Sequence, residues 1–218
     1  MIIHKDCYST IWKIWLGGAI ALFLIYYFIP STVVAYILST IPLFVMGFVT
    51  FFFRVPKRVN AGGDNVVTSV ADGKVIVIEK VYEPEHLKRE CIQVSVYMDF
   101  FNVHVNYWPI SGEVKYYKYH PGKYMLAFLP KASELNEHTS TAIRSQYGDV
   151  FFKQIAGTFA RRIVCYAKPG SQEVKGSQCG IIKFGSRIDM YLPLDADIKV
   201  KLGECVRGSE TVIAELKK

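Results

Sequence analysis

Charged residues are absent from one long stretch of this sequence, the 40 positions from Ile14 to Phe53. Other patterns are scarce as well: the five cysteines form no C-x-x-C pair, no histidine stands at metal-ligand spacing, and the net charge of +7 is not clustered. These absences argue against a disulfide framework, a metal site and a nucleic-acid-binding stripe, and they favour a reducing compartment for the soluble part. Since 51% of the 218 residues are hydrophobic and only 21% are charged, disorder is excluded too.

The uncharged stretch is long enough for two short membrane-spanning helices, each of which needs roughly 20 apolar residues. A break at residues 30–32 (Pro-Ser-Thr) predicts helices over about 12–29 and 33–53, within an anchor of residues 1–56. Basic residues flank the stretch at both ends, namely Lys13, Arg54, Lys57 and Arg58. The positive-inside rule then places both ends, and the domain that follows, on the cytoplasmic face of the cell membrane.

Pro42 lies inside the second apolar segment and keeps an alternative open, a shallow or interfacial anchor instead of a spanning hairpin. We favour the hairpin. A secretory signal is disfavoured, because the apolar run is too long and no A-x-A-like site follows it. An anchor of either kind holds the domain at the membrane surface, and a lipid substrate or simple tethering would explain that equally well.

Residues 57–218 change to short alternating stretches broken by Gly, Pro and Asn, the pattern of a mainly antiparallel β domain with few helices. Together with the apolar hairpin, this predicts an α+β fold class. The clearest predicted strands cover residues 74–79, 91–97, 113–117, 124–129, 163–166, 180–184, 188–192 and 198–202. One helix is expected in this domain, over about 132–143.

No common catalytic motif is present: the sequence has no G-x-S-x-G, H-E-x-x-H, Walker or dinucleotide fingerprint. Of its four Gly-Ser dipeptides, only Gly185-Ser186 lies between two strongly β segments. A serine hydroxyl can attack the carbonyl of the preceding residue if the backbone bends, which glycine permits at least steric cost. Elimination from the resulting ester gives dehydroalanine, which hydrolyses to a pyruvoyl group, an electron sink for an amine substrate. Taken alone, the dipeptide more often marks a turn.

Several motifs around this dipeptide occur together in the order and spacing of one family. They are FGSRID at 184–189, QIAG at 154–157, ARRIVC at 160–165, FFNVHVN at 100–106, FFRVPKR at 52–58, ADG at 71–73, PGK at 121–123 and NE at 136–137. From about Phe51 to Leu216, the chain resembles the short, cytoplasm-facing form of phosphatidylserine decarboxylase. No single motif is decisive, but the set is highly specific.

The resemblance implies a proenzyme that cleaves itself between Gly185 and Ser186. Cleavage would give a β chain of residues 1–185 and an α chain of residues 186–218 that begins with a covalent pyruvoyl group. That group would form a Schiff base with phosphatidylserine, and decarboxylation would yield phosphatidylethanolamine. The implied partners are membrane lipid and the two chains of one precursor, with no metal and no nucleic acid. Whether the protein forms a homo-oligomer stays open.

Asp72 and His104 match the aspartate and the histidine that assist the serine in this family. From the residues alone, Asp72-Gly73 is by default a hairpin turn, and His104 shares a polar strand face with Asn102 and Asn106. Asn102 stands where longer relatives have a second histidine. Because asparagine cannot donate a proton as histidinium does, the acid that reprotonates the product is open, and His104 would serve twice.

Four residues are weaker candidates for substrate binding. Asn102 is one, and His138 is another because relatives often have arginine at its position. Arg161 and Arg162 could bind a lipid phosphate through paired N–H donors. Since adjacent strand residues point to opposite faces, at most one of the two arginines is expected to enter the site.

Two functions of other classes remain open. The Gly- and Val-rich hairpins of residues 164–216 are also typical of lipoyl- or biotinyl-binding modules, which carry a modifiable lysine at a hairpin tip. Lys183 instead lies within a predicted strand. A lipid hydrolase could use Ser186, His104 and Asp72 without cleaving the chain.

Overall fold

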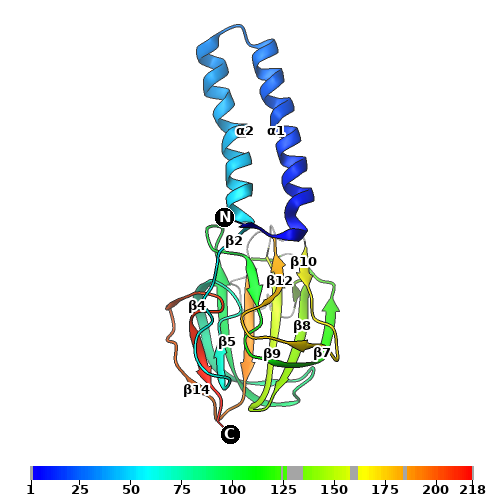
Figure 1. The fold of residues 1–218 in the computed structure, drawn as a ribbon, viewed down its shortest axis with the longest axis vertical. Coiled ribbons are helices and arrows are strands. Elements are labelled where there is room, and N and C mark those ends of the chain that lie inside the picture. Colours follow the sequence, from blue (N-terminus) through cyan, green and yellow to red (C-terminus); the bar gives the residue numbers. More distant parts are fainter. Residues whose placement is uncertain (1, 124, 127–134, 158–161, 184–185, 218) are drawn as a thin grey trace. The chain divides into compact units, whose positions relative to one another are not determined.

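The computed structural model of this protein describes residues 2–123, 125–126, 135–157, 162–183 and 186–217. It divides into two compact units, Met1–Pro56 and Lys57–Lys218. The first unit is mainly helical and the second is built of strands (Figure 1). The predicted fold class, α+β with a mainly antiparallel β domain after an apolar helical hairpin, is confirmed.

The first unit is a pair of antiparallel apolar helices, α1 (Tyr8–Phe28) and α2 (Thr32–Phe52), coloured blue and cyan in Figure 1. The chain leaves α1 at Ile29, whose backbone is extended, because Pro30 has no N–H to continue the helix. Pro42 is accommodated inside α2. The other elements of the unit are β1 (Ile2–Ile3), η1 (Lys5–Cys7) and β2 (Arg54–Val55).

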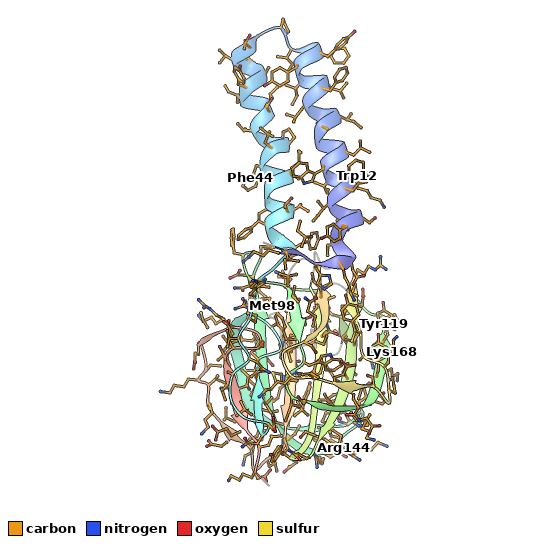
Figure 2. The ribbon with its side chains drawn as sticks, viewed as in Figure 1. Trp12, Phe44, Met98, Tyr119, Arg144 and Lys168 are labelled. Carbon is orange, nitrogen blue, oxygen red and sulfur yellow. The ribbon has the colours of Figure 1, made fainter. Side chains whose placement is uncertain are left out.

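The two helices expose most of their apolar surface. No residue of α1 is buried within the structure, and Trp12 and Phe44 are 68% and 70% exposed (Figure 2). The helices approach each other closely at Gly18, where the β-carbon of a larger residue would require the flexible side chain of Met46 to move. Both helices are long and apolar enough to cross a membrane. Helices that are apolar on all sides are typical of contact with lipid.

Within its described residues, the second unit contains three antiparallel sheets. The largest has eight strands in the order β11-β7-β8-β9-β13-β5-β4-β15, and the two smaller sheets have the orders β10-β12-β6 and β14-β16-β3. The strands are β3 (Val66–Thr68), β4 (Gly73–Glu83), β5 (Arg89–Met98), β6 (Val105–Tyr107), β7 (Gly112–His120), β8 (His138–Ser145), β9 (Gly148–Ala156), β10 (Ile163–Cys165), β11 (Gln172–Glu173), β12 (Gln178–Ile182), β13 (Ser186–Leu192), β14 (Asp197–Ile198), β15 (Cys205–Val206) and β16 (Val212–Glu215).

All three sheets contribute side chains to one hydrophobic core. Strand β13 shows how the period-two pattern builds it: Ile188 and Met190 point into the core, and Arg187 and Asp189 alternate with them on the opposite face. The largest buried side chain, Trp108, packs edge-to-face on the ring of Phe152. The inward-facing side chains of the central strands fill the core. They fix the strand register, because a slip of one residue would turn all of them to the opposite face.

The helix predicted over about 132–143 is wrong in its second half. Residues His138–Ser145 form strand β8, which pairs with β9. The predicted strand over 198–202 is also wrong beyond Ile198, where β14 ends. Residues 132–134, and most of the predicted strand over 124–129, lie outside the described residues.

One end of the eight-stranded sheet brings together positions that are far apart in the sequence. Ser186, at the start of β13, pairs with Met98 at the end of β5 and with Ala156 at the end of β9. His138, at the start of β8, belongs to the same end. Figure 2 labels Met98 here and Arg144 at the opposite end of the domain. The candidate residues collect at the end marked by Met98.

Candidate active site

Ser186 is fully buried at the start of the central strand β13. Its hydroxyl donates to the Sδ atom of Met98 at 3.6 Å. A thioether is only a weak acceptor, so this contact holds the hydroxyl loosely. The serine hydroxyl therefore lies in dry surroundings with a weak hydrogen-bond partner. Gly185, the other half of the predicted cleavage site, lies outside the described residues.

His104 is fully buried immediately before β6, and its partner fixes its tautomer. Nδ1 lies 3.0 Å from the carbonyl oxygen of Asn102. Since a carbonyl oxygen only accepts, Nδ1 carries the hydrogen, and Nε2 of the neutral ring carries the lone pair of a base. The backbone carbonyl of His104 accepts from the N–H of Ile182, the last residue of β12. This bond places His104 beside the segment that leads into Ser186.

Asp72 lies immediately before β4, and both of its carboxylate oxygens are engaged. Oδ2 pairs with Nη2 of Arg58 at 2.5 Å, and Oδ1 accepts from the N–H of Gly208 at 2.8 Å. Arg58 also pairs with Glu210 at 2.9 Å. Burial works to lower the pKa of Arg58, but the two carboxylates outweigh it and raise that pKa. Asp72 is thus held in one orientation by a cation that stays charged.

Asn102 connects these two candidates. Its side chain closes a short turn, in which Oδ1 accepts from the N–H of Asp99 at 2.9 Å, and its backbone carbonyl holds His104. Asn102 and Asp72 also line the same cavity of about 260 Å³, together with Lys74 and other residues. Asp72 and Asn102 thus border one cavity, and His104 is bonded to Asn102 two positions along the chain.

A buried polar chain next to Ser186 was missed by the sequence analysis. The hydroxyl of Thr139 donates to Oε1 of Gln154 at 2.8 Å, and Nε2 of Gln154 donates to Oδ1 of Asn106 at 2.8 Å. All three side chains are buried. The chain joins β8 and β9 to β6 and so crosses between two sheets. One signal was available, because the sequence predicts Asn106 on the same polar strand face as His104.

His138 lies on the opposite face of β8 from Thr139, away from the core into which Ser186 points. Its ring stacks on that of His120, with centroids 4.4 Å apart, and His120 is bonded to Glu85 at 2.6 Å. Burial lowers the pKa of His138, which favours the neutral ring at neutral pH. The structure thus places His138 in a cluster of its own.

Glu85, His120 and His138 form the one group among the described residues whose ligand atoms lie close enough together to suggest a metal. Two observations weigh against that use. The two imidazole rings are nearly parallel, at 14°, so one ion cannot lie in both ring planes. Both oxygens of Glu85 are already taken by hydrogen bonds from Tyr116, His120, Ser140 and Lys153. The geometry favours a hydrogen-bonded cluster.

Arg162 is exposed, and its backbone carbonyl accepts from the N–H of Lys183 at 3.2 Å. This bond places Arg162 beside the segment that leads into Ser186. Lys183 itself follows the last residue of β12, just outside the strand in which the sequence predicted it. Arg161 lies outside the described residues.

Comparison with known proteins shows the family to which this chain belongs. The family model described as phosphatidylserine decarboxylase matches residues 45–214. Relatives named phosphatidylserine decarboxylase proenzyme include one from Amoebophilus asiaticus, 50% identical over 77% of this chain and 75% of its own length. Others come from Cytophaga hutchinsonii and Porphyromonas gingivalis, 42% and 41% identical, each over 99% of both chains. The matched region contains Asp72, His104 and Ser186, and this chain belongs to the phosphatidylserine decarboxylase family.

Proposed function

We propose that this chain is a proenzyme that cleaves itself at Gly185-Ser186 and then decarboxylates phosphatidylserine to phosphatidylethanolamine. The observation that carries the proposal is the placement of Ser186, a fully buried hydroxyl with a weak partner at the start of a central strand. His104 supports it, since its tautomer leaves Nε2 as the basic atom. The word proenzyme in the names of the relatives also supports processing of the chain.

In the self-cleavage step, the Ser186 oxygen attacks the carbonyl carbon of Gly185 and Nε2 of His104 takes the hydroxyl proton. The peptide C–N bond breaks, so that an ester replaces the amide and the amino group of residue 186 is freed. Loss of the Cα proton then expels the carboxylate of Gly185 and leaves dehydroalanine. Water adds to its imine tautomer, and ammonia leaves. The chain 186–218 then begins with a pyruvoyl group.

The residues around Ser186 fit such a group. Among the described residues, the hydroxyl bonds only to the thioether of Met98, so its removal leaves no strong donor or acceptor unpaired. Met98 and Ala156 flank the position and are fully buried, which keeps water out. When present, the pyruvoyl carbonyl supplies a sink for the electron pair that carbon dioxide leaves behind.

Proton return is assigned to His104. A proton must reach the α-carbon of the substrate after carbon dioxide leaves, and Asn102 has no acidic proton to give. Asp72 serves as the carboxylate of the set and, with its oxygens engaged by Arg58 and Gly208, holds the rim of the cavity that it shares with Asn102. The support for Asp72 is its fixed orientation and the cavity that it shares with Asn102, whose carbonyl holds His104.

The apolar helices anchor the enzyme in the membrane that contains its lipid substrate, with the β domain on the cytoplasmic face. Lys13 and Arg54 mark the two cytoplasmic ends of the hairpin. Arg54 stacks on the ring of Phe51, 3.7 Å from its centroid, and donates to its carbonyl, an arrangement suited to a membrane interface. Arg58 takes no part in this charge pattern because Asp72 and Glu210 neutralise it. Arg162, exposed beside the segment that enters Ser186, is assigned to the lipid phosphate.

The decisive experiment compares the intact masses of wild-type protein and Ser186→Ala under denaturing conditions. The wild type is expected to yield a 33-residue fragment, 186–218, that is lighter by one ammonia than the plain peptide. Ser186→Ala is expected to remain one chain of 218 residues. The processed wild type is expected to release carbon dioxide from phosphatidylserine and to lose this activity on treatment with hydroxylamine or borohydride.

An uncleaved wild-type chain that is nonetheless active would overturn the proposal. Labelling of Ser186 by a fluorophosphonate would then indicate the hydrolase, and a mass adduct on Lys183 would indicate the carrier module. Both alternatives predict the same chain length in wild type and Ser186→Ala, whereas the pyruvoyl enzyme predicts different lengths.

A further inference from the structure

Asn106 carries an unexplained polar group in the middle of the β domain. The residue is fully buried on β6, and its Nδ2 atom has no hydrogen-bond partner among the described residues. Leaving a buried donor unpaired is expensive, because the group loses its bonds to water and gains nothing in return. An unpaired N–H donor next to a candidate active site indicates that an acceptor atom of a bound ligand forms the missing hydrogen bond.

In the polar chain described above, the NH₂ end of the Asn106 amide is left over. The hydroxyl of Thr139 donates to Oε1 of Gln154, which leaves Nε2 of Gln154 to donate to Oδ1 of Asn106. The oxygen of Asn106 is therefore used, and its NH₂ group is the open end. Gln154 and Thr139 hold the amide in this orientation, so the donor is in place before any ligand arrives.

The strand register places this open donor near Ser186. Ser186 pairs with Ala156, and Ile188 pairs with Gln154, so Gln154 is a diagonal neighbour of Ser186 on the same face of the sheet. Such neighbours lie about 7–8 Å apart, and Asn106 is bonded directly to Gln154. Two positions before Asn106, on the same side of its extended segment, lies His104.

We infer that the Asn106 amide donates a hydrogen bond to the carboxylate of the serine headgroup, the group that leaves as carbon dioxide. This inference rests on the proposed function. A donor suits an anionic oxygen, and an uncharged donor suits this one in particular. A lysine or arginine would stabilise the charged carboxylate of the bound substrate more than the transition state, in which the negative charge is moving away from the carboxylate. This difference would raise the barrier to decarboxylation. A neutral amide orients the carboxylate with a smaller penalty of that kind.

The test uses three substitutions in the full-length, self-processed protein. Asn106→Asp keeps the shape and the acceptor for Gln154 but replaces the donor by an oxygen. Asn106→Ala removes the amide without adding charge, and Asn106→Ser keeps a smaller donor. Asn65→Asp is the matched control, because Asn65 bonds to Leu216 in the region of the other small sheet. The assays are the mass of the 186–218 fragment, the KM and kcat for phosphatidylserine in detergent micelles, and inhibition by phosphatidylethanolamine.

All variants are expected to self-cleave. Asn106→Asp and Asn106→Ala are expected to raise KM by about tenfold or more, the loss expected for one hydrogen bond to a charged oxygen, while kcat falls less. Asn106→Ser is expected to fall between them and the wild type, and Asn65→Asp to match the wild type. Phosphatidylethanolamine has no carboxylate, so its inhibition constant is expected to stay within about twofold in every variant.

Three results would overturn the inference. A processed Asn106→Ala protein with a wild-type KM would show that the donor contacts no substrate. An equal loss of affinity for phosphatidylethanolamine would show that the Asn106 donor contacts the lipid phosphate or only supports the fold. Loss of self-cleavage in all three Asn106 variants would assign it to the processing step. A wild-type protein that neither cleaves itself nor decarboxylates would instead overturn the proposed function, which separates the two failures.

Discussion

Replacing Glu85 by Gln tests whether the cluster on the outer face of the sheet is a structural device. The Glu85 side chain is 15% exposed and accepts four hydrogen bonds, from Tyr116, His120, Ser140 and Lys153. Burial works to raise the pKa of Glu85, but the bonds from Ser140, His120 and Lys153 outweigh it and lower that pKa from 4.5 to about 2. At roughly 1.4 kcal/mol per pKa unit, ionised Glu85 contributes about 3 kcal/mol to stability at neutral pH.

The sign of the pH dependence follows from the lowered pKa. The contribution of Glu85 is complete above its unfolded pKa near 4.5 and is lost as the pH falls toward the folded value of about 2. Glu85→Gln is therefore expected to be about 3 kcal/mol less stable at pH 7, and the gap is expected to halve near pH 3.

The assay is urea unfolding in detergent, followed by the fluorescence of the buried Trp108, in a Ser186→Ala background that keeps one chain. Glu113→Gln is the control, because Glu113 forms a partly exposed pair with Lys115, and pairs near the surface contribute at most about 1 kcal/mol. A loss below about 1 kcal/mol for Glu85→Gln, or a loss that does not depend on pH, would refute the reasoning.

Two further predictions concern His104 and Asp72. His104→Gln is expected to slow self-cleavage by about 10²- to 10⁴-fold because it removes the base, and the time course of the 186–218 fragment measures it. Added imidazole is expected to restore part of the rate; a wild-type rate without it would contradict the role. Asp72→Asn is expected to destabilise the β domain by about 2–4 kcal/mol, because it leaves the mostly buried Arg58 with Glu210 alone. Urea unfolding at pH 7 measures this, and an unchanged midpoint would contradict it.

The elements that the sequence predicted well are those whose faces alternate cleanly. Strands β5, β7 and β13 appear where the apolar period of two placed them, with ends extended by at most three residues. Strand β8 was missed because its inward face carries Thr139 and Thr141 beside Ile143, so no apolar alternation marks it. The turn that follows has its own signal, Gly148 with a φ of +135°, a conformation that side chains rarely adopt.

The candidate site could be located from sequence only through the family resemblance. Ser186, His104 and Asp72 are separated by up to 114 positions, and no local pattern links them. The surroundings of Ser186 and His104 depend on long-range strand register, above all the pairing of β13 with β5 and β9 and the bond between His104 and Ile182. Long-range register of this kind follows from the packing of the whole core and leaves no mark on a short stretch of sequence.

The polar face shared by His104 and Asn106 shows most clearly what a sequence pattern leaves undecided. Alternation separates a polar face from an apolar one, but an exposed face and a buried polar site give the same pattern. Here the eight-stranded sheet covers that face, and Asn106 meets Gln154 in place of water. A buried polar layer with one open donor weakens the fold. Its presence beside Ser186 is most simply explained by the chemistry that it serves, since a dry, preoriented donor acts more strongly on an anionic ligand than an exposed one.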